Sequence, residues 1–140
     1  MPSEERKMQL EKNLKELGDI SFFDDFGRAY VAYGPRFWFD PYFDSSHFWE
    51  GFTLNGKAVE HVFQNVYEGY DATPFLSEIK CPVLLIGGLY DFSCPPSLWD
   101  GYRDGFSDCT YVLFEDSGHN PMYEIPEKFD KLLIDWINTH

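Results

Sequence analysis

The chain has 140 residues, of which 44% are hydrophobic and 19% aromatic, and its formal net charge is −13. This length and hydrophobic content indicate a folded domain with a modest core and exclude a disordered tail. The excess of acids, without any run of Lys or Arg, argues against nucleic acid and against an anionic membrane surface as partners.

The first part of the chain predicts helices. Ser3 is a suitable N-cap for a helix over residues 3–17, with acids in its first turn and Gly18 at its end. The leucine stripe of this helix is narrow, so we expect it to be peripheral. Residues 25–33 allow a second, short helix. Residues 55–70 predict the clearest helix, with Asn55 as its N-cap and apolar residues at helical spacing.

Residues 20–52 are irregular and rich in aromatic side chains, interleaved with acids and prolines. This composition is typical of a lid or cap over a pocket, although such rings also bury themselves against helices in an ordinary core. We therefore predict a helical, aromatic-rich cap segment over residues 1–74 and an α/β segment over residues 75–140.

The second part predicts a parallel β-α-β unit followed by a helix. Residues 83–86 are a continuous apolar run, which suits a strand buried on both faces. A short helix that Pro95 or Pro96 begins would connect this strand to a second one over residues 110–115. Pro126 begins a final helix, whose buried side is expected to hold Phe129, Leu132, Leu133, Trp136 and Ile137.

An ionisable residue follows each predicted strand, Asp91 after the first and His119 after the second. Because the carboxyl ends of parallel strands lie at one edge of the sheet, these two side chains can meet there. A carboxylate bonded to one histidine nitrogen leaves the other free to accept a proton. Gly118 would let the backbone turn sharply before His119. Taken alone, an Asp after a strand is more often a turn residue or a helix cap than a catalytic group. The pair, in contrast, predicts an acid–base site.

The segments CPVLLIGGLYDFSCPP and YVLFEDSGHNPMYEIPEKFDKLLIDWI resemble the C-terminal half of an α/β-hydrolase, in particular the proline iminopeptidase-like enzymes. The resemblance to the core fold covers residues 79–137, and the aromatic segment before it is more loosely similar to that subgroup's cap. It implies a partial α/β-hydrolase fold, in which a helical cap segment precedes a parallel β-α-β-α unit. The family's triad runs Ser, Asp, His along the chain. Asp91 therefore matches the acid and His119 the histidine.

The chain departs from the family at the nucleophile. It contains no G-x-S-x-G motif and no oxyanion-hole segment of the HGG type. Cys94 could in principle be a nucleophile, but it lies three residues past Asp91 in a Pro-rich turn, which disfavours that role. We therefore expect half of a hydrolase, which would need a missing N-terminal half, in cis or as a separate chain, or would associate with itself.

Two functions fit these observations. In the first, the chain supplies the acid and the histidine of a Ser-Asp-His triad acting on a small-molecule or short peptide substrate, such as an aminopeptidase releasing N-terminal proline. The resemblance suggests that a cap acid such as Glu68 could meet the substrate ammonium group, although charged helix residues of this kind usually face solvent. In the second, the chain is a catalytically inactive, hydrolase-derived module that binds a small apolar ligand or a protein through its aromatic cap.

Cofactors, metals and membranes are not expected. The chain lacks the Gly-rich phosphate loops, and its acidic residues near His47 have no recognised metal-ligand spacing. Cys81, Cys94 and Cys109 include no C-x-x-C pair, which argues against a disulfide framework and a zinc site and indicates a cytoplasmic protein. No apolar run approaches the roughly 18 residues of a membrane span, and the start, MPSEERK, is unlike a secretory signal.

Overall fold

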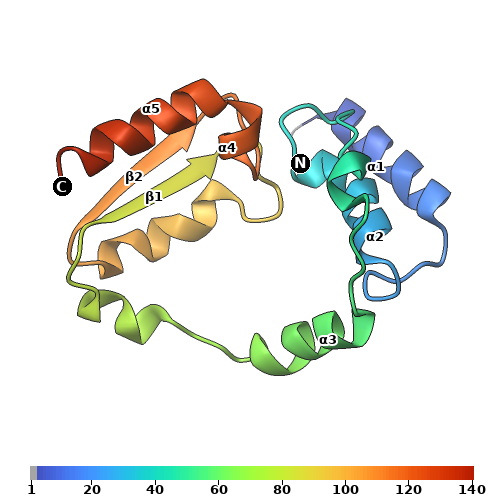
Figure 1. Ribbon diagram of the computed structural model, residues 1–140, viewed down its shortest axis with the longest axis horizontal. Coiled ribbons are helices and arrows are strands. Elements are labelled where there is room, and N and C mark those ends of the chain that lie inside the picture. Colours follow the sequence, from blue (N-terminus) through green and yellow to red (C-terminus); the bar gives the residue numbers. More distant parts are fainter. Residues whose placement is uncertain (1–2) are drawn as a thin grey trace. The chain divides into compact units, whose positions relative to one another are not determined.

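The computed structural model describes residues 3–140 (Figure 1). These residues form two compact units. The first contains the chain up to Pro35 together with Asp40–Asp71, and the second contains Arg36–Phe39 together with Ala72–His140. The short segment 36–39 thus belongs with the second unit, although its sequence neighbours on both sides belong with the first.

The first unit holds α1 (Glu4–Leu17), α2 (Phe26–Ala32) and α3 (Gly56–His61). α1 begins as predicted, because the Ser3 hydroxyl accepts a hydrogen bond from the Arg6 amide at 3.2 Å. It ends at Gly18, whose φ of 71° lies in the region that glycine adopts without strain. The side chain of Asp25 caps α2 in the same way, by accepting from the Arg28 amide at 3.0 Å.

The aromatic side chains of the first unit pack on one another. The rings of Phe22 and Phe26 are 4.5 Å apart between centroids, and Trp49 lies 5.4 Å from Phe26 and 5.1 Å from Tyr30. Gly27 permits this packing, because a Cβ at that position would stand 3.2 Å from the Trp49 side chain. Edge-to-face pairs of this kind stabilise an aromatic cluster beyond the area that they bury.

The helix predicted over residues 55–70 is shorter than expected. Asn55 caps α3, but the α-helix ends at His61 and continues as a π-helical turn over Val62–Val66. A π-helical turn adds a residue to each hydrogen-bonded ring and so breaks the 3.6-residue period on which the prediction relied. Four apolar residues of the predicted face are 46–72% exposed, namely Phe63, Val66, Tyr67 and Tyr70.

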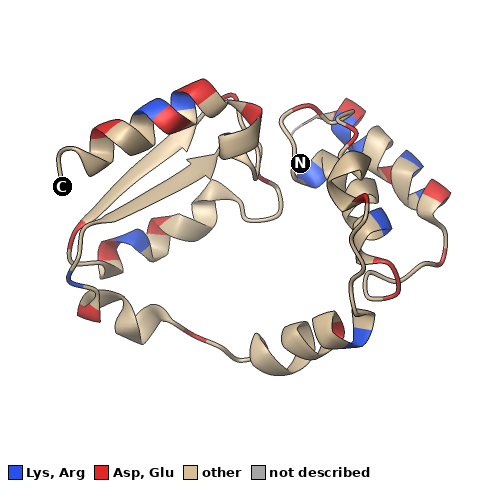
Figure 2. Cartoon of the chain, viewed as in Figure 1, with Lys and Arg blue, Asp and Glu red and all other residues tan. Residues whose placement is uncertain are grey.

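The second unit is built on two parallel strands, β1 (Val83–Gly88) and β2 (Cys109–Phe114). Val83 pairs with Cys109 at one end of the ladder and Gly88 with Phe114 at the other. Neither strand contains a charged residue, as Figure 2 shows. This composition agrees with the predicted apolar strands, but residues 83–86 are half-buried and not buried on both faces, because the sheet has only two strands.

The connection between the strands is not the α-helix that the sequence predicts. It consists of two short 3₁₀ helical turns, Pro96–Gly101, which begins at Pro96 as predicted, and Arg103–Gly105. Gly101 and Gly105 follow closely on Pro96, and residues of these two types are poor at extending an α-helix. In Figure 1 the strands lie between these turns and α5 (Pro126–Ile137).

α5 begins at Pro126 as predicted and follows the short helix α4 (Pro121–Glu124). The side predicted to be buried is only half-buried at Phe129, Leu132, Leu133 and Trp136. Ile137, at the last helical position, is 59% exposed. Within residues 3–140, no helix has the length and the apolar character needed to cross a membrane.

Candidate active site

The loops that follow β1 and β2 bring Asp91 and His119 together. Nδ1 of His119 lies 2.7 Å from Oδ2 of Asp91. Asp91 is only 6% exposed, whereas the His119 side chain is 38% exposed. The arrangement follows from the parallel pairing, since each residue comes shortly after the carboxyl end of its strand.

The second carboxylate oxygen of Asp91 is held by the backbone of its own loop. Oδ1 accepts hydrogen bonds from the amides of Ser93, at 2.9 Å, and of Cys94, at 2.8 Å. Asp91 is therefore a turn residue and a histidine partner at once, with one oxygen for each role. The loop bonds fix the direction in which Oδ2 faces the imidazole.

The carboxylate sets the protonation of the imidazole. An ionised carboxylate only accepts hydrogen bonds, so Nδ1 of His119 carries the shared hydrogen and Nε2 presents its lone pair. The hydrogen bond to Asp91 raises the pKa of His119, and the negative charges of Asp91 and Glu124 add to this effect, while burial opposes it. The site thus favours a histidine that takes up a proton and holds it.

Two glycines let the loops approach each other closely. A Cβ on Gly88 would stand 2.0 Å from the carbonyl oxygen of Gly118, and a Cβ on Gly118 would stand 2.2 Å from that of Phe37. Gly118 was expected to serve a sharp turn, but its φ is not positive. Its role is instead to leave space for the neighbouring backbone, which no residue with a side chain can do.

The segment 36–39 contacts the two loops that carry the pair, and the sequence does not predict these contacts. The His119 amide donates to the Phe37 carbonyl at 2.6 Å, and the Phe92 amide donates to the Arg36 carbonyl at 2.9 Å. The Arg36 guanidinium also donates to the Phe92 carbonyl at 3.2 Å. These contacts join residues more than 50 positions apart, and no local pattern signals them.

Among the residues that the structure describes, no serine hydroxyl is hydrogen-bonded to the His119 ring, whose side-chain partner is Asp91. Ser117 is the serine nearest to His119 in sequence, but it is fully buried and donates its hydroxyl to Oε1 of Glu124 at 3.0 Å. The thiol of Cys94 is poorly suited as well, because burial and the charge of Asp91 raise its pKa and so disfavour the thiolate.

One group of side chains within residues 3–140 has the arrangement of metal ligands. Asp91, Cys94 and His119 each offer a ligand atom, and these atoms lie within 4.8 Å of one another. Oxygen, sulfur and nitrogen ligands of this kind suit Zn²⁺. The hydrogen bond between Asp91 and His119 already accounts for the positions of these two side chains, so the arrangement requires no metal.

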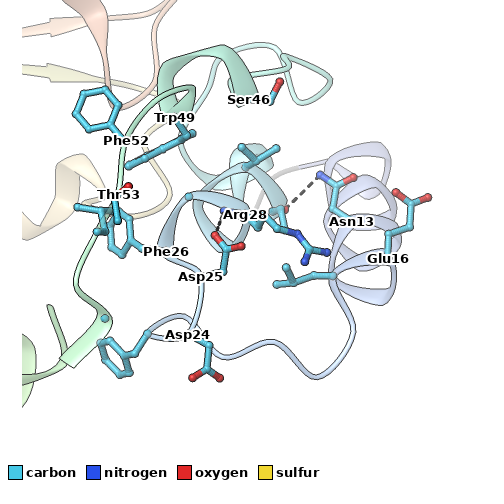
Figure 3. Close-up of a pocket in the computed structure, with 17 residues that line it drawn as sticks. Asn13, Glu16, Asp24, Asp25, Phe26, Arg28, Ser46, Trp49, Phe52 and Thr53 are labelled. Carbon is cyan, nitrogen blue, oxygen red and sulfur yellow. Dashed lines mark hydrogen bonds between the residues drawn. The ribbon is translucent and has the colours of Figure 1, made fainter.

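The first unit contains a separate pocket of about 590 Å³. Figure 3 shows Phe26, Trp49 and Phe52 on one side of it and Asn13 and Glu16 of α1 on the other. A volume of this size is typical of sites for small molecules, and its lining combines aromatic walls with a few polar groups.

Glu68 occupies neither site. It lies exposed in the turn that follows the π-helical segment, rather than on a helix as the sequence predicts, and it does not line the pocket. Its contact with a substrate ammonium group stays a prediction.

Comparisons with known proteins relate the chain to hydrolases. No protein-family model matches the chain. It is similar to an AB hydrolase superfamily protein, YclE, of Bacillus subtilis, with 33% identity over 91 residues, which cover 64% of this chain and 32% of that protein. It is also similar to a proline iminopeptidase of Clostridioides difficile, with 38% identity over 72 residues, 51% of this chain and 24% of that enzyme.

Solved structures confirm the predicted partial α/β-hydrolase fold. An esterase from Exiguobacterium antarcticum superposes with a TM-score of 0.66 and 17% identity, over 96% of this chain and 47% of that chain. An alpha/beta fold family hydrolase from Bacillus anthracis gives a TM-score of 0.60 and 19% identity, over 94% and 47%.

The matched stretches span 24–32% of the length of these two curated relatives and 47% of the two structural neighbours. The similarity in sequence and the similarity in fold point to the same family. In sequence the chain is similar to an AB hydrolase superfamily protein and to proline iminopeptidases, and its fold is that of α/β-hydrolases.

Proposed function

We propose that Asp91 and His119 are the acid and the histidine of a Ser-Asp-His triad and that the chain acts as part of a serine hydrolase. The observation that carries this proposal is the 2.7 Å hydrogen bond between half-exposed His119 and buried Asp91. A general base needs an accessible nitrogen and a partner that orients it. The similarity to proline iminopeptidases supports an aminopeptidase that releases N-terminal proline from short peptides.

In this reaction Nε2 of His119 takes the hydroxyl proton of a serine while the serine oxygen bonds to the substrate carbonyl carbon. The C–N bond then breaks, and the same proton passes from Nε2 to the leaving amine. Water then reacts with the acyl-enzyme: His119 takes a water proton as the water oxygen bonds to the acyl carbon. The bond between that carbon and the serine oxygen breaks, and His119 returns the proton to the serine oxygen. Throughout, Asp91 keeps Nδ1 protonated and stabilises the imidazolium that forms between the steps.

The nucleophile has to come from a further segment of the hydrolase, because the 140 residues contain no G-x-S-x-G motif. We propose that this segment also supplies the oxyanion donors and joins the chain in cis or as a separate polypeptide. The structural neighbours are about twice as long as the part that the chain matches, which is compatible with such an addition. The free cysteines suit a reducing compartment, and the cytoplasm is the proposed location.

A fluorophosphonate probe tests this function, because it labels a serine that a neighbouring base activates. We expect no labelling of the 140-residue chain alone, or of a G-x-S-x-G-bearing N-terminal segment from a matched proline iminopeptidase alone. The mixture, or a fusion of the two, should become labelled. His119→Gln should abolish this labelling, whereas His61→Gln, on exposed α3, should retain it. Absence of labelling in every combination would contradict the proposal.

A second candidate function is supported by the pocket of the first unit: binding of a small apolar ligand without catalysis. The pocket is lined by aromatic rings and does not depend on a nucleophile. Desolvation of such rings by an apolar ligand favours binding, and the polar groups opposite them would orient it.

Tryptophan fluorescence distinguishes this candidate, since Trp49 lines the pocket. Small esters and proline peptides should quench or shift the emission in a saturable way. Trp49→Phe should remove the signal, whereas Trp136→Phe, on α5, should retain it. A titration that gives no saturable change, together with labelling in the complemented hydrolase, would leave only the catalytic function.

A further inference from the structure

The carboxylate of Glu124 has an unusual number of hydrogen-bond donors around it. Oε1 accepts from the Gly118 amide at 2.8 Å, from the Ser117 hydroxyl at 3.0 Å and from the Asn120 amide at 3.2 Å. Oε2 accepts from the Phe39 amide at 2.6 Å. The four donors come from two separate stretches of chain, and one side chain at the end of α4 joins them.

Three of the four donors flank His119 in sequence. Gly118 and Asn120 are its two neighbours, and their amides are bonded to the same carboxylate oxygen. The amide of His119 itself points elsewhere, to the Phe37 carbonyl at 2.6 Å. The amides before and after His119 are therefore bonded to Glu124, whereas the amide of His119 itself is bonded to Phe37.

Only a carboxylate satisfies this arrangement. An ionised carboxylate accepts at both oxygens and donates nothing, so it can serve three donors on one oxygen and one on the other. A glutamine amide has the same shape, but its NH₂ group would face either the Phe39 amide or the three donors of the His119 loop. In either orientation a donor would face a donor. The three donors of the His119 loop are part-buried, so leaving them unpaired is costly, whereas the Phe39 amide lies at an exposed position.

We propose that Glu124 is a positioning residue for His119, which ties the Ser117–Asn120 loop to residues 36–39 and so keeps the imidazole against Asp91. This role rests on the proposed function of Asp91 and His119 as an acid–histidine pair. Glu124 lies in α4, outside the loops that carry the pair, and it acts on His119 through the backbone. Its charge acts in the same direction, because it adds to the increase in the pKa of His119.

The experiment follows His119 by NMR in the full 140-residue chain labelled with ¹⁵N. The charged and titratable groups around the imidazole are Asp91, Cys94 and Glu124, with Arg36 beside Cys94. Two quantities are measured: the pKa of the His119 ring, and the hydrogen-exchange rate of the His119 amide. The second is specific for positioning, because that amide is bonded to Phe37 and not to Glu124.

Glu124→Gln is compared with Glu127→Gln, a matched change of charge on an exposed residue in the first turn of α5. We expect Glu124→Gln to lower the pKa of His119 by roughly half a unit or more and to speed exchange of the His119 amide at least tenfold. Glu127→Gln should leave both quantities close to the wild-type values. A folded Glu124→Gln variant with wild-type pKa and wild-type exchange would overturn the proposal.

Two further measurements test the proposal if Glu124→Gln does not fold, and test the Asp91–His119 pair separately. If Glu124→Gln does not fold, the wild-type chain still tests the proposal, since rapid exchange of the Gly118 and Asn120 amides would show that Glu124 does not hold them. Asp91→Asn tests the underlying pair and should lower the pKa of His119. If Asp91→Asn lowers the pKa of His119 but Glu124→Gln changes neither the pKa nor the amide exchange, the role of Glu124 alone is refuted. If Asp91→Asn leaves the pKa of His119 unchanged, the proposed function is refuted.

Discussion

Gly88 at the end of β1 and Gly118 in the His119 loop are in such close contact that a Cβ on Gly88 would stand 2.0 Å from the Gly118 carbonyl oxygen. The same side of Gly88 faces the Ser117 carbonyl, which accepts a hydrogen bond from the Tyr90 amide at 2.9 Å. The backbone that carries Asp91 and the backbone that carries His119 are thus joined directly. This contact explains why the two side chains reach hydrogen-bond distance.

We expect Gly88→Ala to separate the two loops, because neither backbone can give way without loss of this contact. The free energy of unfolding should fall by about 1–3 kcal/mol, as in other overpacked sites, and the pKa of His119 should fall towards 6.5, its ordinary value. Urea unfolding and NMR titration measure these effects. Gly101→Ala is the control, since nothing lies within 4 Å of its Cβ position. An unchanged pKa in Gly88→Ala would contradict the argument.

The stability of the chain should depend on pH through His119. The folded chain holds the proton of His119 more tightly than the unfolded chain, because the pKa is raised from 6.5. The stabilisation is therefore complete below about pH 6.5 and is lost as the pH rises through the raised pKa. Asp91→Asn should remove this pH dependence, and Asp130→Asn, an exposed change on α5, should not. Urea unfolding at a series of pH values measures it; equal slopes in the two variants would refute the assignment.

Arg6 should be important for the stability of the first unit although it belongs to a peripheral helix. It is 3% exposed, and its guanidinium donates to the buried Pro35 carbonyl at 2.7 Å. Arg6→Ala removes this donor, and a buried carbonyl without a partner costs about 1–3 kcal/mol. Lys12→Ala, on an exposed position of the same helix, should cost much less. Circular dichroism during urea unfolding compares the two, and equal losses would show that the bond contributes nothing.

We expect the 140-residue chain to associate with a second copy of itself. A sheet of two strands has unpaired edges, and the segment after α3 exposes Phe63, Val66 and Tyr67. The net charge of −13 opposes association, so added salt should promote it. Val66→Gln combined with Tyr67→Gln should shift the molecular mass from light scattering towards the monomer, whereas Lys57→Gln should not. A cooperative, purely monomeric wild-type chain at every salt concentration would disprove this expectation.

The sequence predicts well those features that depend on neighbouring residues. Ser3, Gly18 and Asn55 act as helix caps through contacts within four residues, so their roles follow from residue type and spacing. The parallel strands follow from apolar runs, and the meeting of Asp91 and His119 follows from the rule that parallel strands end at one edge. The roles of these two residues in catalysis remain a prediction.

The sequence predicts poorly where competing backbone geometries are close in energy. The apolar pattern of residues 55–70 fits an α-helix, yet the chain inserts a π-helical turn at Val62–Val66. The strand connection is made of 3₁₀ turns because proline and glycine interrupt it. In both places the hydrophobic pattern is satisfied by more than one helical period, so periodicity cannot choose between them.

Residue types and spacing alone determined the two parallel strands, the helix caps and the pair at the strand ends, because each of these arises from short-range geometry or from a general property of parallel sheets. The tertiary structure alone decided that residues 36–39 join the second unit, that Gly88 and Gly118 leave space for backbone, and that Glu124 accepts four hydrogen bonds. These features depend on groups brought together from distant parts of the chain. Their partners exist only once the chain has folded, and no local pattern can specify them.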